Sequence, residues 1–364
     1  MTKSVVVLTT PGDLQAFAVI ESLRRQGLDP FVWFPADFPT NSREVVSISG
    51  ERLSFTLKVG KREISTFRAD TVWLRRIGSN SDVSALHPAD RMFGWSQRQA
   101  FREGSLQALF PEAFWVNPPA TARLADNKLF QQSAAASLGF MTPPSLYTND
   151  PDEIRAFLQF HGGNIVYKTF PAAAWRNSEE LLACHTVCIS EEDLVADELL
   201  AATPGIYQAL VPKLYEIRLT LMGTQPFAVK IFSQDTEKGK LDWRRAYDEI
   251  RMEPTALPAW LVDTCILLMK RLNLVFGCFD FIVDTTGNYI FLEVNQQGQF
   301  LFVERYANVP LLDAFSQFLI QGRSFSWRGR GSGIRYEDVV ESAEELSNAA
   351  AMEHVSNPIP SVSE

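Results

Sequence analysis

The sequence predicts a multidomain α/β protein in which an N-terminal unit of alternating strands and helices is followed by a mostly antiparallel sheet. A β-branched run at residues 4–9 precedes a helical pattern that begins after Asp13 and ends at Gly27. This order is typical of a mononucleotide-type α/β unit. Farther along, apolar segments of strand length end in turn residues, which predicts an antiparallel sheet. These segments are residues 215–222, 227–232, 277–283 and 289–294.

The N-terminal region continues with short apolar and alternating stretches. Residues 31–34 and 71–77 each predict a strand, and residues 45–59 predict a hairpin that turns near Gly50. The pattern of residues 93–110 predicts a helix, after which the consecutive prolines 118 and 119 interrupt the chain. We therefore assign residues 1–118 to a first domain.

A central region, residues 119–206, alternates helical patterns with short strands. Helices are expected at residues 122–138, 150–160 and 191–200, and a strand is expected at residues 164–169. The stretch 172–189 predicts a hairpin.

The remaining chain divides into a third domain, residues 207–327, and a tail, residues 328–364. A helix at residues 258–272 precedes the last hairpin of the third domain. The tail begins with Arg-Gly-Arg-Gly-Ser-Gly, a composition typical of a flexible linker. An acidic amphipathic helix is expected at residues 336–352, followed by disorder.

Composition limits the function. The chain has 364 residues, with 34 Lys and Arg against 43 Asp and Glu, for a net charge of −9. Because surfaces that bind nucleic acid need excess positive charge, we expect no nucleic-acid partner. Residues 335–364 carry seven carboxylates and one arginine. Most of the acidity therefore belongs to the tail, and the rest of the chain has room for a cationic site.

Location and redox state follow from similar observations. No apolar stretch is long enough to cross a membrane, so we expect a cytoplasmic protein with no membrane partner. The four cysteines are too scattered for a disulfide framework. Cys184, His185 and Cys188 form a compact group, but no second pair of ligands matches it, so reduced thiols are the better interpretation.

Two carboxylates and one carboxamide lie in the last predicted hairpin. Asp280 and Glu293 sit in otherwise apolar strands and can lie opposite each other, while Asn295 shares a face with Glu293. Such a set of hard oxygen ligands suits Mg²⁺, which completes its shell with phosphate and water. The alternative is a pair of strand-end carboxylates that arginines neutralise.

A second set of residues has the opposite charge. Lys128 lies in a predicted helix, Lys168 in an apolar strand, and Arg218 in the segment 215–222. A lysine in a buried strand must find an anion, although an edge-strand lysine that reaches solvent remains an alternative for Lys168. Polyphosphate together with Mg²⁺ would account for both sets.

These residues resemble those of the ATP-grasp ligases, and more narrowly the graspetide (microviridin-type) synthetases, which close macrocycles in ribosomal peptides (RiPPs). The resemblance runs from about residue 4 to residue 322. The narrower match rests on Asp37-Phe38-Pro39-Thr40, Val72-Trp73-Leu74-Arg75-Arg76, Asn117-Pro118-Pro119, Asp126-Asn127-Lys128, Leu241-Asp242-Trp243-Arg244 and Phe291-Leu292-Glu293-Val294-Asn295-Gln296-Gln297-Gly298-Gln299. It implies an α+β ATP-grasp fold with an N-terminal pre-ATP-grasp domain, a lid-like central domain and a C-terminal antiparallel-sheet domain.

The resemblance also implies roles, carried over by position. Lys128 and Lys168 would hold the α- and β-phosphates of ATP, and the segment Gln208, Ala209, Leu210 and Val211 would contact adenine. Glu216 would bind the ribose, Arg218 would neutralise the transferring phosphate, and Arg244, with Asp242 beside it, would face the acceptor carboxylate. Asp280, Glu293 and Asn295 would coordinate Mg²⁺.

The partner implied by the resemblance is a ribosomal precursor peptide whose Asp or Glu side chains are joined to Lys, Ser or Thr. Its leader would dock near residues 172–200, where Trp175, Glu191, Glu192 and Asp193 are candidate contacts. Asp193 and the two glutamates could equally form an acidic helix start, and Trp175 could be a core residue. Arg75 and Arg76 are further candidates, of which at most one can face a given cleft if both lie on a strand. Family members commonly form homodimers.

Two other functions fit the same residues. The first is an ATP-grasp ligase that joins an amino acid to a small molecule or to a protein C-terminus, which would differ only at the acceptor site. The second is a non-catalytic regulator that binds nucleotide or peptide; the complete set of charged residues argues against it. The chain contains no P-loop, nucleophile-elbow or zincin motif.

Overall fold

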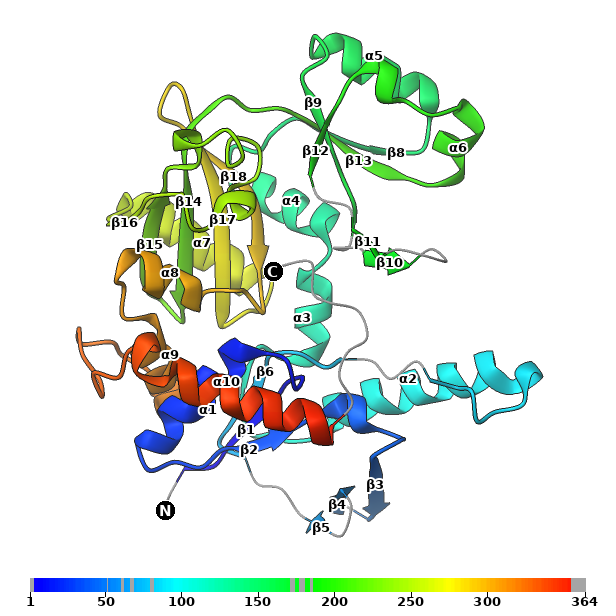
Figure 1. Ribbon diagram of the computed structural model, residues 1–364, viewed down its shortest axis with the longest axis vertical. Coiled ribbons are helices and arrows are strands. Elements are labelled where there is room, and N and C mark those ends of the chain that lie inside the picture. The colour runs from blue at the N-terminus through cyan, green and yellow to red at the C-terminus, as the bar shows by residue number, and fades with distance from the viewer. Residues whose placement is uncertain are drawn as a thin grey trace. The chain divides into compact units, whose positions relative to one another are not determined.

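The computed structural model describes residues 3–50, 52–59, 62–65, 69–78, 82–170, 174–176, 181–183 and 186–354 (Figure 1). The chain forms two compact units. Unit 1 combines Met1–Ala122 with Pro310–Pro358, and unit 2 contains Arg123–Val309.

Unit 1 is built on a parallel sheet with the strand order β2(Phe31–Trp33), β1(Val5–Leu8), β6(Thr71–Leu74) and β7(Phe114–Val116). The strands are apolar on both faces because helices cover both, as is usual for parallel sheets. Trp73 on β6 packs against Phe315 of α9(Leu311–Gln321), with ring centroids 4.9 Å apart. Val72 and Leu74 instead pack with Leu106 of α2(Arg91–Ala108).

A three-stranded antiparallel sheet adds to unit 1. The predicted hairpin appears as β3(Ser42–Ser49) and β4(Arg52–Val59), and β5(Arg62–Ser65) pairs with β4 as a third strand. Phe55 and Leu57 of β4 are buried in the same core as β1 and β6.

The C-terminal segment belongs to unit 1. Helix α10(Tyr336–Glu353) packs on α1(Leu14–Arg25), as Figure 1 shows, and buries Tyr336, Val339 and Ala343. The Ser347 hydroxyl donates a hydrogen bond to the carbonyl of Pro11 (2.7 Å). The predicted acidic helix is therefore present, and it is a built-in layer of unit 1.

The segment expected to be a flexible linker is anchored. The carboxylate of Asp313, at the start of α9, accepts hydrogen bonds from the backbone N–H groups of Gly331, Ser332 and Gly333 at 2.8–3.0 Å. Asp313 is 2 % exposed. Glycine favours flexibility because it lacks a Cβ, but hydrogen bonds from the backbone to a buried carboxylate hold this segment in place.

The first part of unit 2 is an antiparallel sheet with the order β12(Val187–Ile189), β9(Ile165–Lys168), β13(Gly205–Ala209) and β8(Ser145–Thr148). Its core combines Ile165 and Tyr207 with Ile154 and Leu158 of α5(Pro151–Phe160) and Leu200 of α6(Asp197–Ala202). Residues 172–189 contain the hairpin β10(Ala174–Arg176) and β11(Leu181–Ala183), followed by β12.

The second part of unit 2 is a five-stranded antiparallel sheet. Its order is β16(Met252–Thr255), β15(Gln225–Ile231), β14(Lys213–Met222), β17(Phe276–Asp284) and β18(Tyr289–Asn295). Helices α7(Ala259–Arg271) and α4(Lys128–Ser137) pack on one face in a shared core. A further helix, α8(Leu301–Ala307), follows β18.

Two predicted helices are each divided in the structure. Residues 122–138 form α3(Pro119–Ala125) and α4, because the Asn127 side chain caps a new helix by accepting the N–H of Phe130 (3.0 Å). Residues 191–200 form a 3₁₀ turn, Glu191–Asp193, and then α6. None of the helices in the described part of the chain is long and apolar enough to span a bilayer.

Candidate active site

The site lies on the polar face of the five-stranded sheet. Alternation along β14 and β17 sends Ile217, Leu219, Phe279 and Phe281 into the core beneath the sheet. The intervening residues point to the other face. They are Glu216, Arg218, Asp280 and, from β18, Glu293 and Asn295.

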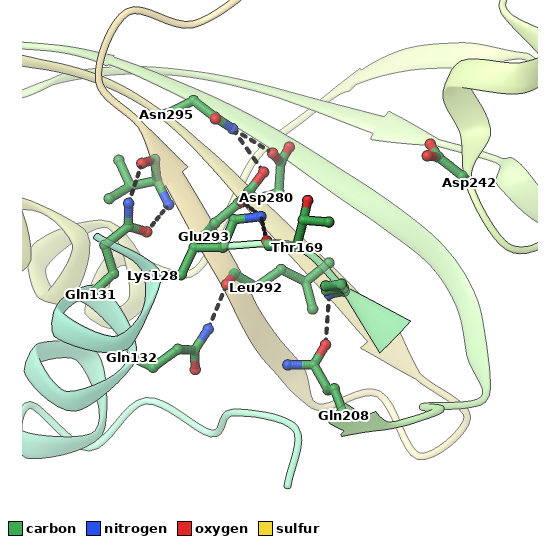
Figure 2. A network of polar contacts seen from close by, with 12 residues as sticks. Lys128, Gln131, Gln132, Thr169, Gln208, Asp242, Asp280, Leu292, Glu293 and Asn295 are labelled. Atoms are coloured by element: carbon green, nitrogen blue, oxygen red, sulfur yellow. Dashed lines mark hydrogen bonds and ion pairs between the residues drawn. The ribbon is translucent and has the colours of Figure 1, made fainter. Parts of the chain in front are cut away.

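Asp280 and Glu293 lie directly across from each other in the β17–β18 ladder, as the sequence predicts. A β-bulge at this point leaves Leu292 out of the ladder, and its carbonyl accepts a hydrogen bond from the Gln132 side chain instead (2.5 Å). The Asn295 amide donates to Asp280 Oδ2 (3.0 Å) and to Glu293 Oε1 (3.2 Å), so the three side chains converge (Figure 2).

Arg218 is the charge partner of Asp280. Its Nη1 lies 2.8 Å and 2.7 Å from the two carboxylate oxygens, and its Nη2 donates to the carbonyl of Gln299 (2.5 Å). Burial alone would lower the pKa of Arg218, but Asp280 outweighs it and the pKa is raised. For Asp280, burial and the nearby charge of Glu293 raise the pKa, against the opposing effect of Arg218.

The two predicted phosphate-binding lysines lie beside Glu293. Lys128 is the first residue of α4, and its Nζ is 4.0 Å from Glu293 Oε2 and 3.2 Å from the carbonyl of Thr169. Burial would raise the pKa of Glu293, but the positive charges of Lys128, Lys168 and Arg244 lower it overall. The carboxylate therefore stays ionised at neutral pH.

Lys168, at the end of β9, has no acidic partner within 4.0 Å in the described part of the chain. Its Nζ donates to Gln208 Oε1 (2.6 Å), a neutral acceptor. Desolvation lowers the pKa of Lys168 to about 8, with Lys128 and Arg244 adding to the effect and Glu293 opposing it. A cation that lacks a nearby anion suits the negatively charged phosphates of a nucleotide.

The segment predicted to contact adenine connects β13 to β14. Gln208 is 5 % exposed, and its amide donates to Ser145 while its oxygen accepts from Lys168. Its side chain therefore positions Lys168. The backbone N–H groups of Ala209 and Leu210 donate to the carbonyls of Pro144 and Asn164 (2.9 Å and 2.8 Å). Val211 follows in the connection between the two strands. Because the N–H groups of Ala209 and Leu210 already have partners, adenine would contact other backbone groups of this segment.

Glu216, the predicted ribose ligand, forms a buried ion pair. Lys213 Nζ lies 2.6 Å from Glu216 Oε1 and 3.3 Å from the carbonyl of Leu241. Burial raises the pKa of Glu216, and Lys213 opposes this.

Asp242 and Arg244 form a second ion pair, and Figure 2 shows Asp242 apart from Asp280, Glu293 and Asn295. Asp242 is 5 % exposed and accepts hydrogen bonds from the Arg244 backbone N–H, Nε and Nη2 at 2.8–3.1 Å. The Asp242 carboxylate, which was predicted to belong to the catalytic set, thereby holds Arg244. Arg244 is half-exposed, and its charge reaches both Asp280 and Glu293.

The residues present fit Mg²⁺. Asp280 and Glu293 are like charges in contact with one carboxamide, and a divalent cation would relieve their repulsion. The Asn295 amide would turn so that its oxygen faces the cation, because oxygen and not NH₂ is the ligand. In the described residues no group of three or more His, Cys, Asp or Glu side chains could hold a metal ion, so the carboxamide would complete this set.

The two predicted substrate arginines both form ion pairs with Asp13 in unit 1. Strand β6 ends at Leu74, and both Arg75 Nε (2.9 Å) and Arg76 Nε (3.1 Å) contact the same Asp13 oxygen. The expectation that they face opposite sides is wrong, because alternation holds only within a strand. Arg75 is 2 % exposed and Arg76 about a quarter exposed.

The structure describes some of the side chains that were predicted to contact the leader. Glu191 and Glu192 are exposed, whereas Asp193 accepts hydrogen bonds from the Ser190 N–H and hydroxyl (2.7 Å each) and caps the turn. A depression of about 490 Å³ is lined by Ser190, Glu191 and Glu192. Trp175 lies on β10, but its side chain is outside the described residues, as are Cys184 and His185. Cys188, Cys265 and Cys278 form no disulfide.

Sequence reasoning missed Lys213 and Gln131. Gln131 of α4 is 3 % exposed, and its side chain both donates to the carbonyl of Val294 (2.9 Å) and accepts the N–H of Val294 (2.8 Å). It therefore fixes α4, and with it Lys128, against β18. A buried glutamine in a helix was the available signal for Gln131. Lys213 lies just before the predicted strand 215–222, so the argument that found Lys168 did not apply to it.

Comparison with known proteins identifies the fold. No protein-family model and no curated protein matches the chain, but solved structures do. The RiPP-associated ATP-grasp ligase of Chryseobacterium gregarium, in complex with ADP and a leader and core peptide, has a TM-score of 0.78 at 22% identity and covers 92% of this chain and 100% of that chain.

Two further structures are similar. Macrocyclase MdnB from Microcystis aeruginosa MRC has a TM-score of 0.74 at 29% identity, covering 88% of this chain and 100% of its own. ATP-grasp ligase PsnB, complexed with a precursor variant, Mg and ADP, has a TM-score of 0.69 at 25% identity, covering 88% and 99%. The chain therefore has the ATP-grasp fold, and its predicted resemblance to the peptide-macrocyclising branch is confirmed.

Proposed function

We propose that the protein is an ATP- and Mg²⁺-dependent ligase that closes macrocycles in a ribosomal precursor peptide. It would activate Asp or Glu side chains as acyl phosphates and join them to Ser, Thr or Lys side chains. The main support is one observation: Asp280, Glu293 and Asn295 converge on one sheet face beside Lys128 and Lys168. Similar folds bind ADP, Mg and precursor peptides.

The chemistry needs charge neutralisation and positioning more than a protein nucleophile. A peptide carboxylate oxygen forms a bond to the γ-phosphorus while the bond to ADP breaks. The nucleophile then attacks the acyl carbon, phosphate leaves, and the nucleophile loses its proton. The net change in the peptide is the loss of one water for each ring.

The charged side chains divide this work. Lys128 and Lys168 would hold the phosphates near ADP, and Arg244 would hold the acceptor carboxylate or the acyl phosphate. Arg218 acts through Asp280, whose orientation it fixes. Mg²⁺, when held by Asp280, Glu293 and Asn295, would neutralise charge on the phosphate oxygens.

The leader would dock on the surface around α6, and the exposed residues there support this. Val187, Val195 and Leu199 are exposed apolar residues, with Leu199 63% exposed. Exposed acidic groups, including Glu191 and Glu192, adjoin them in sequence and line the depression described above. An apolar surface with an acidic rim suits an amphipathic peptide that carries arginine or lysine.

A homodimer is supported by helix α2. Met92, Phe93 and Trp95 are 81%, 68% and 45% exposed, and they lie together in its first turns. Contiguous exposed apolar side chains of this size mark interaction surfaces. The described free thiols support a location in the reducing cytoplasm.

The function is tested with a purified precursor peptide rich in Asp or Glu and Ser, Thr or Lys. Incubation with ATP and Mg²⁺ should lower the peptide mass by whole numbers of waters and release one ADP for each ring. A gain in mass by one amino-acid residue would instead indicate ligation of a free amino acid. Nucleotide binding without ADP release would indicate a non-catalytic regulator.

Substitution of a metal ligand tests the site directly. Glu293→Gln keeps the shape of the side chain but removes a negative charge, so ADP release with peptide and Mg²⁺ should fall roughly 100-fold or more. Glu249→Gln is the matched control, because Glu249 is an exposed residue of the same unit, paired only at the surface with Lys238. Undiminished ADP release by Glu293→Gln would contradict the metal assignment.

A further inference from the structure

The chain between β15 and β16, residues 232–251, is called the acceptor loop here; it carries Arg244, whose charge acts on both Asp280 and Glu293. Its backbone hydrogen bonds are mostly local, as in Arg245 to Asp242 (3.1 Å) and Glu249 to Ala246 (3.0 Å). One side of the loop packs through Trp243 on Phe302 of α8, with ring centroids 5.1 Å apart. A loop held in this way needs other tethers if Arg244 is to stay in place.

The ion pair between Lys213 and Glu216 supplies a tether from the sheet. Lys213 Nζ donates to the carbonyl of Leu241, the residue before Asp242, while Glu216 Oε1 holds the same Nζ at 2.6 Å. The segment that leads to Arg244 is thereby joined to β14.

Local geometry makes this pairing possible. Residues three apart on a regular strand point to opposite faces. In β14 the pairing register with β17 shifts between Lys213 and Tyr215, so a β-bulge turns Lys213 to the face of Glu216. The two side chains are only 8% and 9% exposed, and the bulge brings Nζ to 2.6 Å from Oε1.

We propose that Lys213 is a positioning residue for ring closure: through Leu241 and Glu216 it holds the acceptor loop so that Arg244 faces the carboxylate site. This inference rests on the proposed function. Without the tether, phosphoryl transfer would still produce ADP and an acyl phosphate. The acyl phosphate would more often react with water, which regenerates the peptide carboxylate and releases phosphate without a ring.

The test is the number of ADP molecules released for each ring, measured by ADP assay and peptide mass spectrometry. Lys213→Met should slow ring closure roughly tenfold or more while ADP release falls less, so the ratio rises well above one. Lys213→Arg, which can donate to both oxygens, should restore a ratio close to one. Lys230→Met is the control, because Lys230 lies over Tyr215 on the neighbouring strand and should leave the ratio unchanged.

Lys213→Met leaves Glu216 as an unpaired buried carboxylate and could prevent folding, so a second variant combines Lys213→Met with Glu216→Gln. It removes both charges of the pair and should raise the ratio in the same direction. An unchanged ratio in folded Lys213→Met and in the double variant would overturn the positioning role. A raised KM for ATP with an unchanged ratio would also overturn it, because Lys213 would then serve the nucleotide. Wild-type protein that forms no rings would instead contradict the proposed function.

Discussion

Lys168 is a cation held by a neutral neighbour. Its position in an apolar strand predicts an anionic partner, yet its Nζ contacts the amide oxygen of Gln208. The desolvated ammonium group keeps a lowered pKa of about 8 as a result. Binding of a polyphosphate would supply the missing negative charge and raise the pKa again.

We therefore expect ATP affinity to depend on pH through Lys168. Below pH 8 the free protein holds Lys168 charged, and as the pH rises through 8 the proton is lost and affinity should fall, by roughly tenfold for each pH unit above the pKa. Calorimetry between pH 6.5 and 9.5 measures this change, with proton uptake on binding at the upper end. The Lys168→Arg variant should show a flat profile, because arginine stays charged. A flat profile in the wild type would contradict the prediction.

At the residue scale, side-chain alternation along a strand correctly places Glu293 and Asn295 on one face. The pairing of Asp280 with Glu293 depends on the bulge at Leu292, because the register set by the turn would place Asp280 opposite Leu292. The same alternation failed for Arg75 and Arg76, since the strand ends one residue earlier and both side chains reach Asp13. Strand ends depend on tertiary contacts, which the local pattern does not contain.

At the scale of single elements, helix breaks and bulges position the site. The break at Asn127 places Lys128 at a helix start, and the bulge in β14 turns Lys213 toward Glu216. The sequence offered a capping signal at Asn127, but the apolar pattern on both sides concealed it. A bulge leaves no comparable trace, because one additional residue in a strand has no characteristic side chain.

The segment around α6 permits a prediction about the precursor peptide. Leu199→Ser removes an exposed apolar contact, so binding of a labelled leader peptide, measured by fluorescence anisotropy, should weaken by roughly tenfold. Turnover of a core peptide without a leader should stay unchanged. Phe160→Ser is the control, because Phe160 is 84% exposed at the end of α5 and lies outside the proposed surface. Equal leader affinity in Leu199→Ser and wild type would place the leader elsewhere.

At the scale of the whole molecule, the apolar start of α2 predicts self-association. Wild-type protein should sediment as a dimer at micromolar concentration, and Phe93→Glu should shift it to monomer because a charge would be buried in the interface. Trp260→Glu, at a 59% exposed position on α7, should leave the dimer intact. A monomeric wild type at these concentrations would contradict a homodimer through α2.

The division into units was the least visible feature of the sequence. Composition indicated that residues 328–364 form a linker and a separate tail, because glycine-rich segments lack side chains that pack. The buried carboxylate of Asp313 binds that segment through backbone groups, which composition does not reveal. Helices α9 and α10 then complete unit 1 from the far end of the chain.

This arrangement has a consequence for synthesis on the ribosome. Phe315 and Phe318 of α9 cover Trp73 and Phe114, and these two rings emerge with the first stretch of unit 1. These two rings stay without the cover of α9 until the whole of unit 2 has been translated, because α9 follows unit 2 in the sequence. The described part of unit 2 is one continuous segment, so its core is complete first, in contrast to the usual order in which N-terminal domains fold before later ones. The residues proposed to bind nucleotide are therefore assembled on the nascent chain before the unit that precedes them in sequence.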